Sequence, residues 1–193
     1  MKKVSSLVLF LGIAAVLVLW GVSVYNRLVS QDEAVNSAWS QVENVYQRRA
    51  DLIPNLVATV KGYAAHESST LEAVVNARSR ATQTRVDDLS EQSVQQFQEA
   101  QGALSSALSR LLMVVENYPD LKANENFMDL QAQLEGTENR IAEARRVFNE
   151  TARGYNTEVR RFPANLIAGI FNFSTKGYFT ADEAARTAPK VEF

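Results

Sequence analysis

The residues of this chain that are able to do chemistry are few, and none is arranged as an active site. His66 is the single histidine, and the chain has no cysteine. His66 and Glu67 begin the pattern of a zinc protease, but Thr70 stands where that pattern needs its second histidine. One histidine without cysteine is a poor ligand set for zinc or iron. We therefore expect no metal and no cofactor, and we interpret His66 as a residue at a helix end.

The signatures of nucleotide-binding and hydrolase sites are absent as well. The sequence contains no Gly-x-x-x-x-Gly-Lys, and no expected strand precedes a pair of glycines. The serines have only His66 as a potential base, which does not make a triad. Without a nucleophile–base pair, a metal ligand set or a phosphate loop, the sequence predicts a protein that is not an enzyme.

A polar cluster interrupts an otherwise apolar helical stripe. The cluster consists of Arg48, Arg49, Asp51, Pro54 and Asn55. Arg49 falls on the apolar register, so it should approach the interior, where a charge needs a partner. Glu138 and the carboxylates between Asp120 and Glu125 are candidate partners. We interpret Arg49 as half of a buried ion pair that fixes helix register, and the alternative is a ligand or partner site at the proline.

A second polar group lies in the link between two expected helices. It consists of Tyr118, Pro119, Asp120, Asn124 and Glu125. Turn and helix-capping chemistry accounts for these residue types, but their amides and carboxylates would also suit a partner-binding loop. A hard-oxygen metal site stays open, although no EF-hand spacing is present. Asn139 and Arg140 complete the set of candidate interaction or structural residues.

The element that must position these residues begins as a membrane anchor. Residues 4–24 carry no charge, and about 21 residues of helix span roughly 31 Å, which matches the hydrocarbon core of a bilayer. A cleaved signal peptide is the alternative, but its apolar core is shorter and its cleavage site is poorly matched by Gly21-Val22-Ser23. Trp20 and Tyr25 stand where interfacial aromatic residues are expected.

Charge predicts the side of the membrane and argues against some partners. Lys2 and Lys3 precede the span, whereas Arg27 is the only nearby base after it. The positive-inside rule therefore predicts a cytoplasmic N-terminus and a body outside the membrane. Removing residues 1–24 takes away two of the 20 basic residues and none of the 22 acidic ones, which leaves 169 residues with a net charge of about −4. Such a body is not typical of a nucleic-acid binder.

The remainder of the chain is predicted to be helical, because apolar residues recur at alternating spacings of three and four. The expected helices run from Val4 to about His66, from a capping box at Ser69–Glu72 to about Arg85, from Asp87–Glu91 to Pro119, and from Asn124 to about Arg161. A kink or break is expected at Pro54. A short apolar segment, residues 164–171, follows.

These elements predict an all-α fold in which the transmembrane helix continues into an antiparallel four-helix bundle of long helices. The expected units are an anchor at residues 1–24, a bundle domain at residues 25–171 and an irregular, partly mobile tail at residues 172–193. Because no proline or glycine separates the span from the first soluble helix, we expect the body to be held rigidly at the membrane.

The chain resembles the LemA family through several ordered blocks. In the first half these are Tyr25–Val29, Ala38–Glu43, Arg48–Val57, Val60–Tyr63, His66-Glu67 and Ala77-Arg78. In the second half they are Glu116–Glu125, Leu134–Ile141, Tyr155-Asn156 and Phe162-Pro163. The resemblance implies a bacterial membrane protein with one N-terminal span and a helical bundle, without an established enzymatic activity, a cofactor or a set of catalytic residues.

Two functions are consistent with these features. The first is a structural scaffold that self-associates as a homo-oligomer through helix faces left apolar after the core is filled. The second is a membrane-anchored adaptor that binds another envelope protein through the Pro54 cluster or the link from Tyr118 to Asn126. The apolar segment at residues 166–171, with Phe173, Tyr178 and Phe179, is expected to cap the bundle; alternatives are docking on a neighbouring subunit or lying on the membrane surface.

Overall fold

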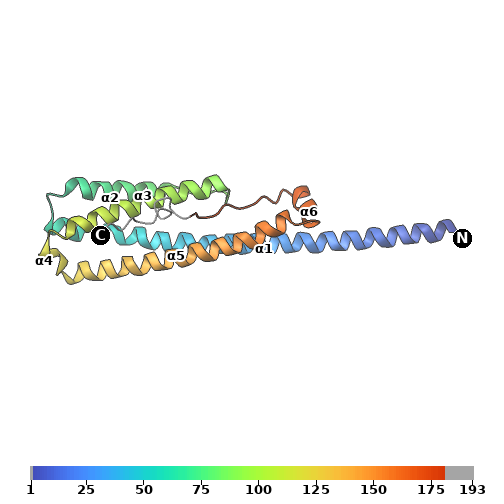
Figure 1. The fold of residues 1–193 in the computed structure, drawn as a ribbon, viewed down its shortest axis with the longest axis horizontal. Helices are drawn as coiled ribbons and strands as arrows, with labels where there is room; N and C mark the ends of the chain where they lie inside the picture. The colour runs from blue at the N-terminus through green and yellow to red at the C-terminus, as the bar shows by residue number, and fades with distance from the viewer. Residues whose placement is uncertain (1, 181–193) are drawn as a thin grey trace, which may run out of the picture.

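The chain folds as helices throughout the part that the computed structural model describes, residues 2–180, with side chains from Val8 onward. No strand occurs in that range. The helices are α1 (Lys2–Tyr63), α2 (Ser68–Gln83), α3 (Glu91–Val115), α4 (Pro119–Lys122), α5 (Glu125–Arg160) and α6 (Ala164–Ile170). The predicted all-α class is therefore confirmed (Figure 1).

Helix α1 is a single continuous helix of 62 residues that projects far beyond the other elements (Figure 1). Its first part is long and apolar enough to cross a membrane, and only 6% of its most apolar window is buried. A core helix of a soluble protein would be mostly buried, so this segment is not one; a membrane span and a signal sequence both have this composition. From Val24 onward the same helix buries one face in the body.

The expected break at Pro54 is wrong, because α1 continues through this residue to Tyr63. Proline has no N–H, so the carbonyl of Ala50 loses its helical hydrogen-bond donor. Arg78 on α2 replaces that donor: its Nε lies 2.7 Å from the Ala50 oxygen. A neighbouring helix thus satisfies the backbone group that the proline leaves unpaired.

The body is an antiparallel four-helix bundle, as predicted. Helix α5 packs along α1 over most of its length, and the hairpin of α2 and α3 packs on the part of α1 that lies farther from residue 2. We call the end near α4 the distal end and the end near α6 the proximal end (Figure 1). The alternating spacing of three and four apolar residues accounts for this nearly lengthwise packing.

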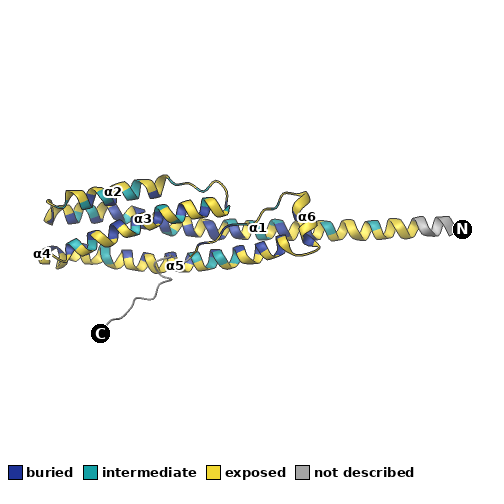
Figure 2. Cartoon of the chain, turned by 45° about the horizontal axis from the view of Figure 1, so that its top comes forward, coloured by how far each residue is buried: buried dark blue, intermediate teal, exposed yellow. Residues whose placement is uncertain are grey.

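The buried residues line the inner sides of the helices (Figure 2). They form two clusters, one after the other along the bundle. The proximal cluster is aromatic: the ring of Trp39 lies 5.1 Å from that of Phe97 and 5.3 Å from that of Phe148. The distal cluster consists mainly of aliphatic residues such as Leu56, Leu104 and Leu111. Trp39 on α1, Phe97 on α3 and Phe148 on α5 thus bring rings from three helices together in the proximal core.

Several predicted helix boundaries need correction. Asn124 caps α5 as expected, since its Oδ1 accepts a hydrogen bond from the Phe127 N–H at 3.1 Å. The capping box at Ser69 does not form, because α2 begins at Ser68 without a side-chain cap. Within the start predicted at Asp87–Glu91, Ser90 caps α3, and Asp88 accepts hydrogen bonds from the Ser90 and Ser93 hydroxyls. These hydrogen bonds hold the pKa of Asp88 below its usual value.

The segment after α6 is irregular, as predicted, but residues 173–180 are firmly packed against the bundle. Phe179 is buried in the proximal cluster and stacks on Trp39 at 5.8 Å. Asn149 and Asn156 on α5 hydrogen-bond to the backbone of Phe179 and Lys176 at 2.8–2.9 Å. The packed body therefore extends past residue 171 to at least Thr180; residues 181–193 of the expected tail lie outside the described residues.

Candidate functional site

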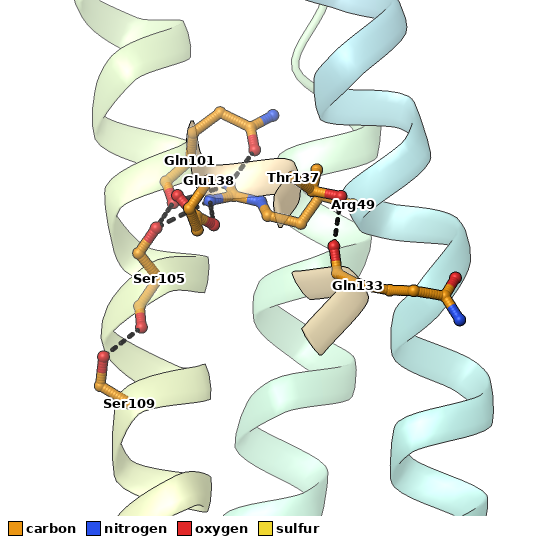
Figure 3. A network of polar contacts seen from close by, with 7 residues as sticks. All are labelled: Arg49, Gln101, Ser105, Ser109, Gln133, Thr137 and Glu138. Atoms are coloured by element: carbon orange, nitrogen blue, oxygen red, sulfur yellow. Dashed lines mark hydrogen bonds and ion pairs between the residues drawn. The ribbon is translucent and has the colours of Figure 1, made fainter. Parts of the chain in front are cut away.

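A buried polar layer lies between the two hydrophobic clusters. Figure 3 shows its polar contacts. Arg49 on α1 is only 1% exposed, and Gln101 on α3 and Thr137 on α5 are also buried. Ile53 lies one turn beyond Arg49 in the distal cluster, and Tyr46 lies one turn before it in the proximal cluster. The apolar register of α1 places Arg49 here, because its position points the side chain inward.

The guanidinium of Arg49 binds groups from two other helices. On α3, Nη1 donates to Ser105 Oγ at 2.8 Å, and Nη2 donates to the side-chain and main-chain oxygens of Gln101 at 2.6 and 3.2 Å. On α5, Glu138 accepts a hydrogen bond from Nη1 at 2.9 Å. Of the candidate carboxylates, Glu138 rather than one between Asp120 and Glu125 is therefore the partner, and the contacts join α1, α3 and α5 at one level.

Gln101 extends the layer to α2, the remaining long helix of the bundle. Its Nε2 donates to the Ala81 oxygen at 3.2 Å, which is one of the carbonyls left without a helical donor at the C-terminus of α2. The layer therefore contacts all four long elements of the bundle. If one helix slid along its axis relative to the others, these contacts would break. The layer can therefore fix the register of the helices.

Tyr46 closes the proximal side of the layer. Its ring lies 5.0 Å from the guanidinium carbon of Arg49, within range of a cation–π interaction. Burial raises the pKa of the Tyr46 hydroxyl, and the charges of Arg145 and Arg49 oppose that rise. The phenol therefore stays neutral at physiological pH and offers no nucleophile.

The chemistry available to this layer is hydrogen bonding and charge neutralisation. The four hydrogen bonds of the Arg49 guanidinium all go to oxygens of the protein, and of its three nitrogens only Nε has no partner. Among the described side chains, no group of three or more His, Asp or Glu residues is arranged to hold a metal ion. The geometry favours the interpretation of a structural ion pair over that of a ligand site.

The other members of the Pro54 cluster are not brought together with Arg49. Arg48, Asp51, Pro54 and Asn55 are all exposed on α1. Asp51 accepts a hydrogen bond from Gln47 Nε2 one turn earlier, at 2.8 Å. The cluster therefore divides into one buried arginine and a polar outer surface.

Arg48 instead lines a shallow hollow of about 510 Å³ together with α5 residues that include Asp129 and Arg140. A second shallow hollow, of about 430 Å³, is lined by residues that include Asn139, Arg140 and Val45. We call this surface the α1–α5 face. It brings three of the candidate residues, Arg48, Asn139 and Arg140, onto one side of the bundle.

The second polar group holds the distal end together. The Tyr118 hydroxyl donates a hydrogen bond to Glu67 Oε1 at 3.0 Å, which raises the pKa of the tyrosine. Asn124 Nδ2 donates a hydrogen bond to the Tyr63 hydroxyl at 3.0 Å. Pro119 is the first residue of α4 rather than a simple stop for α3. Asp120 and Glu125 are exposed and remain available to a partner.

Sequence reasoning missed residues whose role depends on tertiary contacts. Gln101 was visible as the one polar residue in the apolar stripe of α3, and that signal could have paired it with Arg49. Arg78, Asn149 and Asn156 carry no such signal, because each bonds to a main-chain atom of a distant segment. Phe179 lies outside any periodic pattern, but it was among the residues expected to cap the bundle, and it is buried in the proximal cluster.

Comparison with known proteins gives a consistent assignment. Residues 38–193 match the sequence profile of the LemA family. Magnetosome protein MamQ 2 from Paramagnetospirillum magneticum is 28% identical over 182 residues, covering 84% of this chain and 67% of the relative. Magnetosome protein MamQ from Magnetospirillum gryphiswaldense is 26% identical with the same coverage. Protein LemA from Metamycoplasma hominis is 24% identical, covering 83% of this chain and 71% of that protein.

Proposed function

We propose, from the premise that the chain belongs to the LemA family, that it is a single-pass membrane scaffold without catalytic chemistry. Its apolar first segment and its similarity to LemA and MamQ proteins support association with a membrane. In this function α1 spans the bilayer and holds the bundle as a rigid rod at the membrane surface. The bundle then presents surfaces to other proteins.

The observation that carries this proposal is the continuity of α1. The helix passes from its exposed apolar part into the buried core without a loop, a proline or a helix end before Pro54. At 1.5 Å per residue, the part from Asn26 to Tyr63 is about 57 Å long. The ion pair between Arg27 and Glu158 and the contact of Lys176 Nζ with Asp32 at 2.7 Å tie this helix to the body just beyond the span.

We propose that the N-terminus is cytoplasmic and the body lies outside the inner membrane, because of the two lysines before the span. Since the chain has no cysteine, a single Ser109→Cys variant reports the side directly. A membrane-impermeant maleimide added to intact spheroplasts should label it. Labelling only after lysis would place the body in the cytoplasm and contradict this topology.

We further propose that the scaffold self-associates through the α1–α5 face. The body retains no apolar stripe along its length among the described residues, so an extended hydrophobic interface is not supported. The α1–α5 face is hollowed and carries both signs of charge, from Arg48, Arg140 and Asp129. Such a surface suits a polar interface between copies arranged side by side in the membrane.

Light scattering of the full-length protein in mild detergent tests self-association. We expect a discrete assembly, and the double substitution Arg48→Glu and Arg140→Glu should reduce it to smaller species. Arg153→Glu is the matched control, because Arg153 is exposed on α5 but lines neither hollow. A monomeric wild-type protein would exclude the oligomeric scaffold.

The adaptor function is the second candidate, and the distal end favours it. Four large apolar side chains are exposed in the distal half, namely Tyr63, Val75, Met113 and Met128. Asp120 and Glu125 are exposed at the same end. Reversing both charges should abolish co-purification of an envelope partner while circular dichroism stays unchanged. Partner capture that survives this reversal would exclude the distal end as the contact.

A further inference from the structure

Helix α6 has an unusual distribution of small and large apolar residues. Its buried positions are Ala164 and Ala168, whereas Leu166 and Ile170 are 55% and 69% exposed. The flanking rings of Phe162 and Phe171 are 76% and 54% exposed. A helix that faces water normally buries its large apolar side chains first, so this arrangement points to an apolar environment outside the bundle.

The position of α6 along α1 indicates what that environment is. Ile167 packs against Gly21, where an added Cβ would lie 3.6 Å from the Ile167 Cδ1 atom. The ring of Phe171 lies 4.7 Å from that of Tyr25. Gly21 is three residues, or about 4.5 Å, inside the end of the charge-free run at Val24. Helix α6 therefore sits level with the last turn of the span, where α1 becomes exposed (Figure 2).

The charge around α6 fits the surface of a bilayer. Residues 159–181 contain no acid, although the body as a whole is acidic. Of the three bases in this range, Lys176 is paired with Asp32, which leaves Arg160 and Arg161 beside α6. Arg160 and Arg161 are exposed and directly precede Phe162. Basic residues beside exposed aromatic and aliphatic side chains are the composition of segments that lie in the membrane interface.

We propose that α6, with Phe162 and Phe171, docks into the headgroup–acyl boundary of the same bilayer that α1 spans, and that Arg160 and Arg161 bind anionic lipid headgroups. This inference rests on the proposed membrane-spanning role of α1. Two contacts with the bilayer then fix the rod, since a span alone leaves it free to rotate and tilt. A second copy of the chain is the competing occupant of this surface.

Depth-dependent fluorescence quenching tests the docking, because the chain lacks cysteine and accepts one label at a chosen place. Full-length Ile170→Cys is labelled with an environment-sensitive dye and placed in vesicles of phosphatidylcholine and phosphatidylglycerol. A nitroxide near the headgroup end of the lipid chain serves as the quencher. We expect quenching at least about twofold stronger than for the same dye on Met113→Cys, which lies at the distal end.

A Val16→Cys label in the span, measured with a second nitroxide near the methyl end of the lipid chain, separates failure of the docking from failure of the anchor. If the Val16 label is quenched and the Ile170 label behaves like the Met113 label, α1 spans the membrane and the docking is wrong. If the Val16 label is not quenched either, the anchor itself is wrong. An Ile170 label that is shielded from both the lipid nitroxide and aqueous iodide lies under a second copy, which also overturns the proposal.

The headgroup contact has its own test in the labelled Ile170→Cys protein. The substitutions Arg160→Gln and Arg161→Gln should reduce quenching in vesicles that contain phosphatidylglycerol and leave it unchanged in pure phosphatidylcholine. Arg153→Gln is the control, because this exposed arginine lies farther back along α5. Equal quenching with and without the two arginines in both lipids would overturn the assignment of anionic headgroups as ligands.

Discussion

At the scale of single residues, Arg49 is the side chain whose removal should affect the contacts of the most helices. Arg49→Met keeps an unbranched, flexible stem but removes the guanidinium and its hydrogen bonds to Gln101, Ser105 and Glu138. Buried polar atoms of Gln101 then lose their donor, which should lower the free energy of unfolding by about 3 kcal/mol. Urea unfolding in mild detergent, followed by circular dichroism, measures this loss.

Glu138→Gln is the matched control for that experiment. The Glu138 side chain is 49% exposed, so water screens the pair and can replace the lost charge. Its removal should cost under about 1 kcal/mol. Equal losses for the two variants would mean that the ion pair, rather than the buried hydrogen bonds to α3, stabilises the layer.

Tyr155 makes the stability of the body sensitive to alkaline pH. Burial, and then the nearby carboxylate of Asp32, raise the pKa of Tyr155 to about 12 from its ordinary value of 10.0. The unfolded chain therefore releases this proton first as pH rises. The stabilisation is complete below pH 10 and should fall by up to about 1.4 kcal/mol per pH unit until pH approaches the folded-state pKa.

Comparison of Tyr155→Phe with the wild type isolates this effect in urea unfolding between pH 9 and pH 12. The variant lacks the titrating group, so its stability should decline less steeply. Asp32→Asn removes one of the causes of the raised pKa and should give an intermediate slope. Parallel curves for wild type and Tyr155→Phe would show that Tyr155 does not control the alkaline limit.

The sequence was informative about individual residues where periodicity constrained them. The register of α1 predicted that Arg49 is buried, and the need for a countercharge limited its partners to a few carboxylates, Glu138 among them. The hydrogen bond from Arg78 to Ala50 was not predictable in this way. It depends on the rotation of α2 against α1, which local spacing does not determine.

At the scale of elements, α2 supplies the hydrogen-bond donor that α1 lacks because of Pro54. Arg78→Met should leave the Ala50 carbonyl without a donor and lower the free energy of unfolding by about 1–3 kcal/mol. With Pro54→Ala in the same chain, the restored N–H at position 54 can bond to Ala50, so Arg78→Met should cost less. A double-mutant cycle measures this coupling. A coupling energy near zero would show that Arg78 does not compensate for the proline.

The segment after α6 is an element that helix periodicity could not reveal. The side-chain amides of Asn149 and Asn156 hydrogen-bond to the main chain of this segment and so hold it extended along α5. Gly177 allows the closest approach: its N–H lies 2.7 Å from the Leu89 oxygen, and an added Cβ would lie 2.7 Å from the Glu91 Cα atom. Those neighbours are main-chain atoms, which cannot move aside as a side-chain tip can.

Gly177→Ala should therefore release this segment from α3. Hydrogen exchange of residues 173–180 should become faster, while exchange in the distal half stays as it is. Gly136→Ala is the control, because a Cβ at Gly136 has no atom within 4 Å. Unchanged exchange at residues 173–180 in Gly177→Ala would show that the α3 contact does not hold the segment.

At the scale of the whole molecule, the continuous α1 and the contacts near Tyr25 predict a rod of fixed height above the bilayer. A dye on Met113→Cys and acceptor lipids in the vesicle surface report that height by energy transfer, and we expect a closest approach of about 50 Å. Four glycines inserted between Asn26 and Arg27 interrupt the helix at the membrane, so the distal end should come closer and its distance distribution should broaden. A wild-type distribution as broad as that of the glycine variant would show that the body swings on a tether. The scaffold would then bind its partners through a mobile body, and the rigid connection inferred from α1 would be wrong.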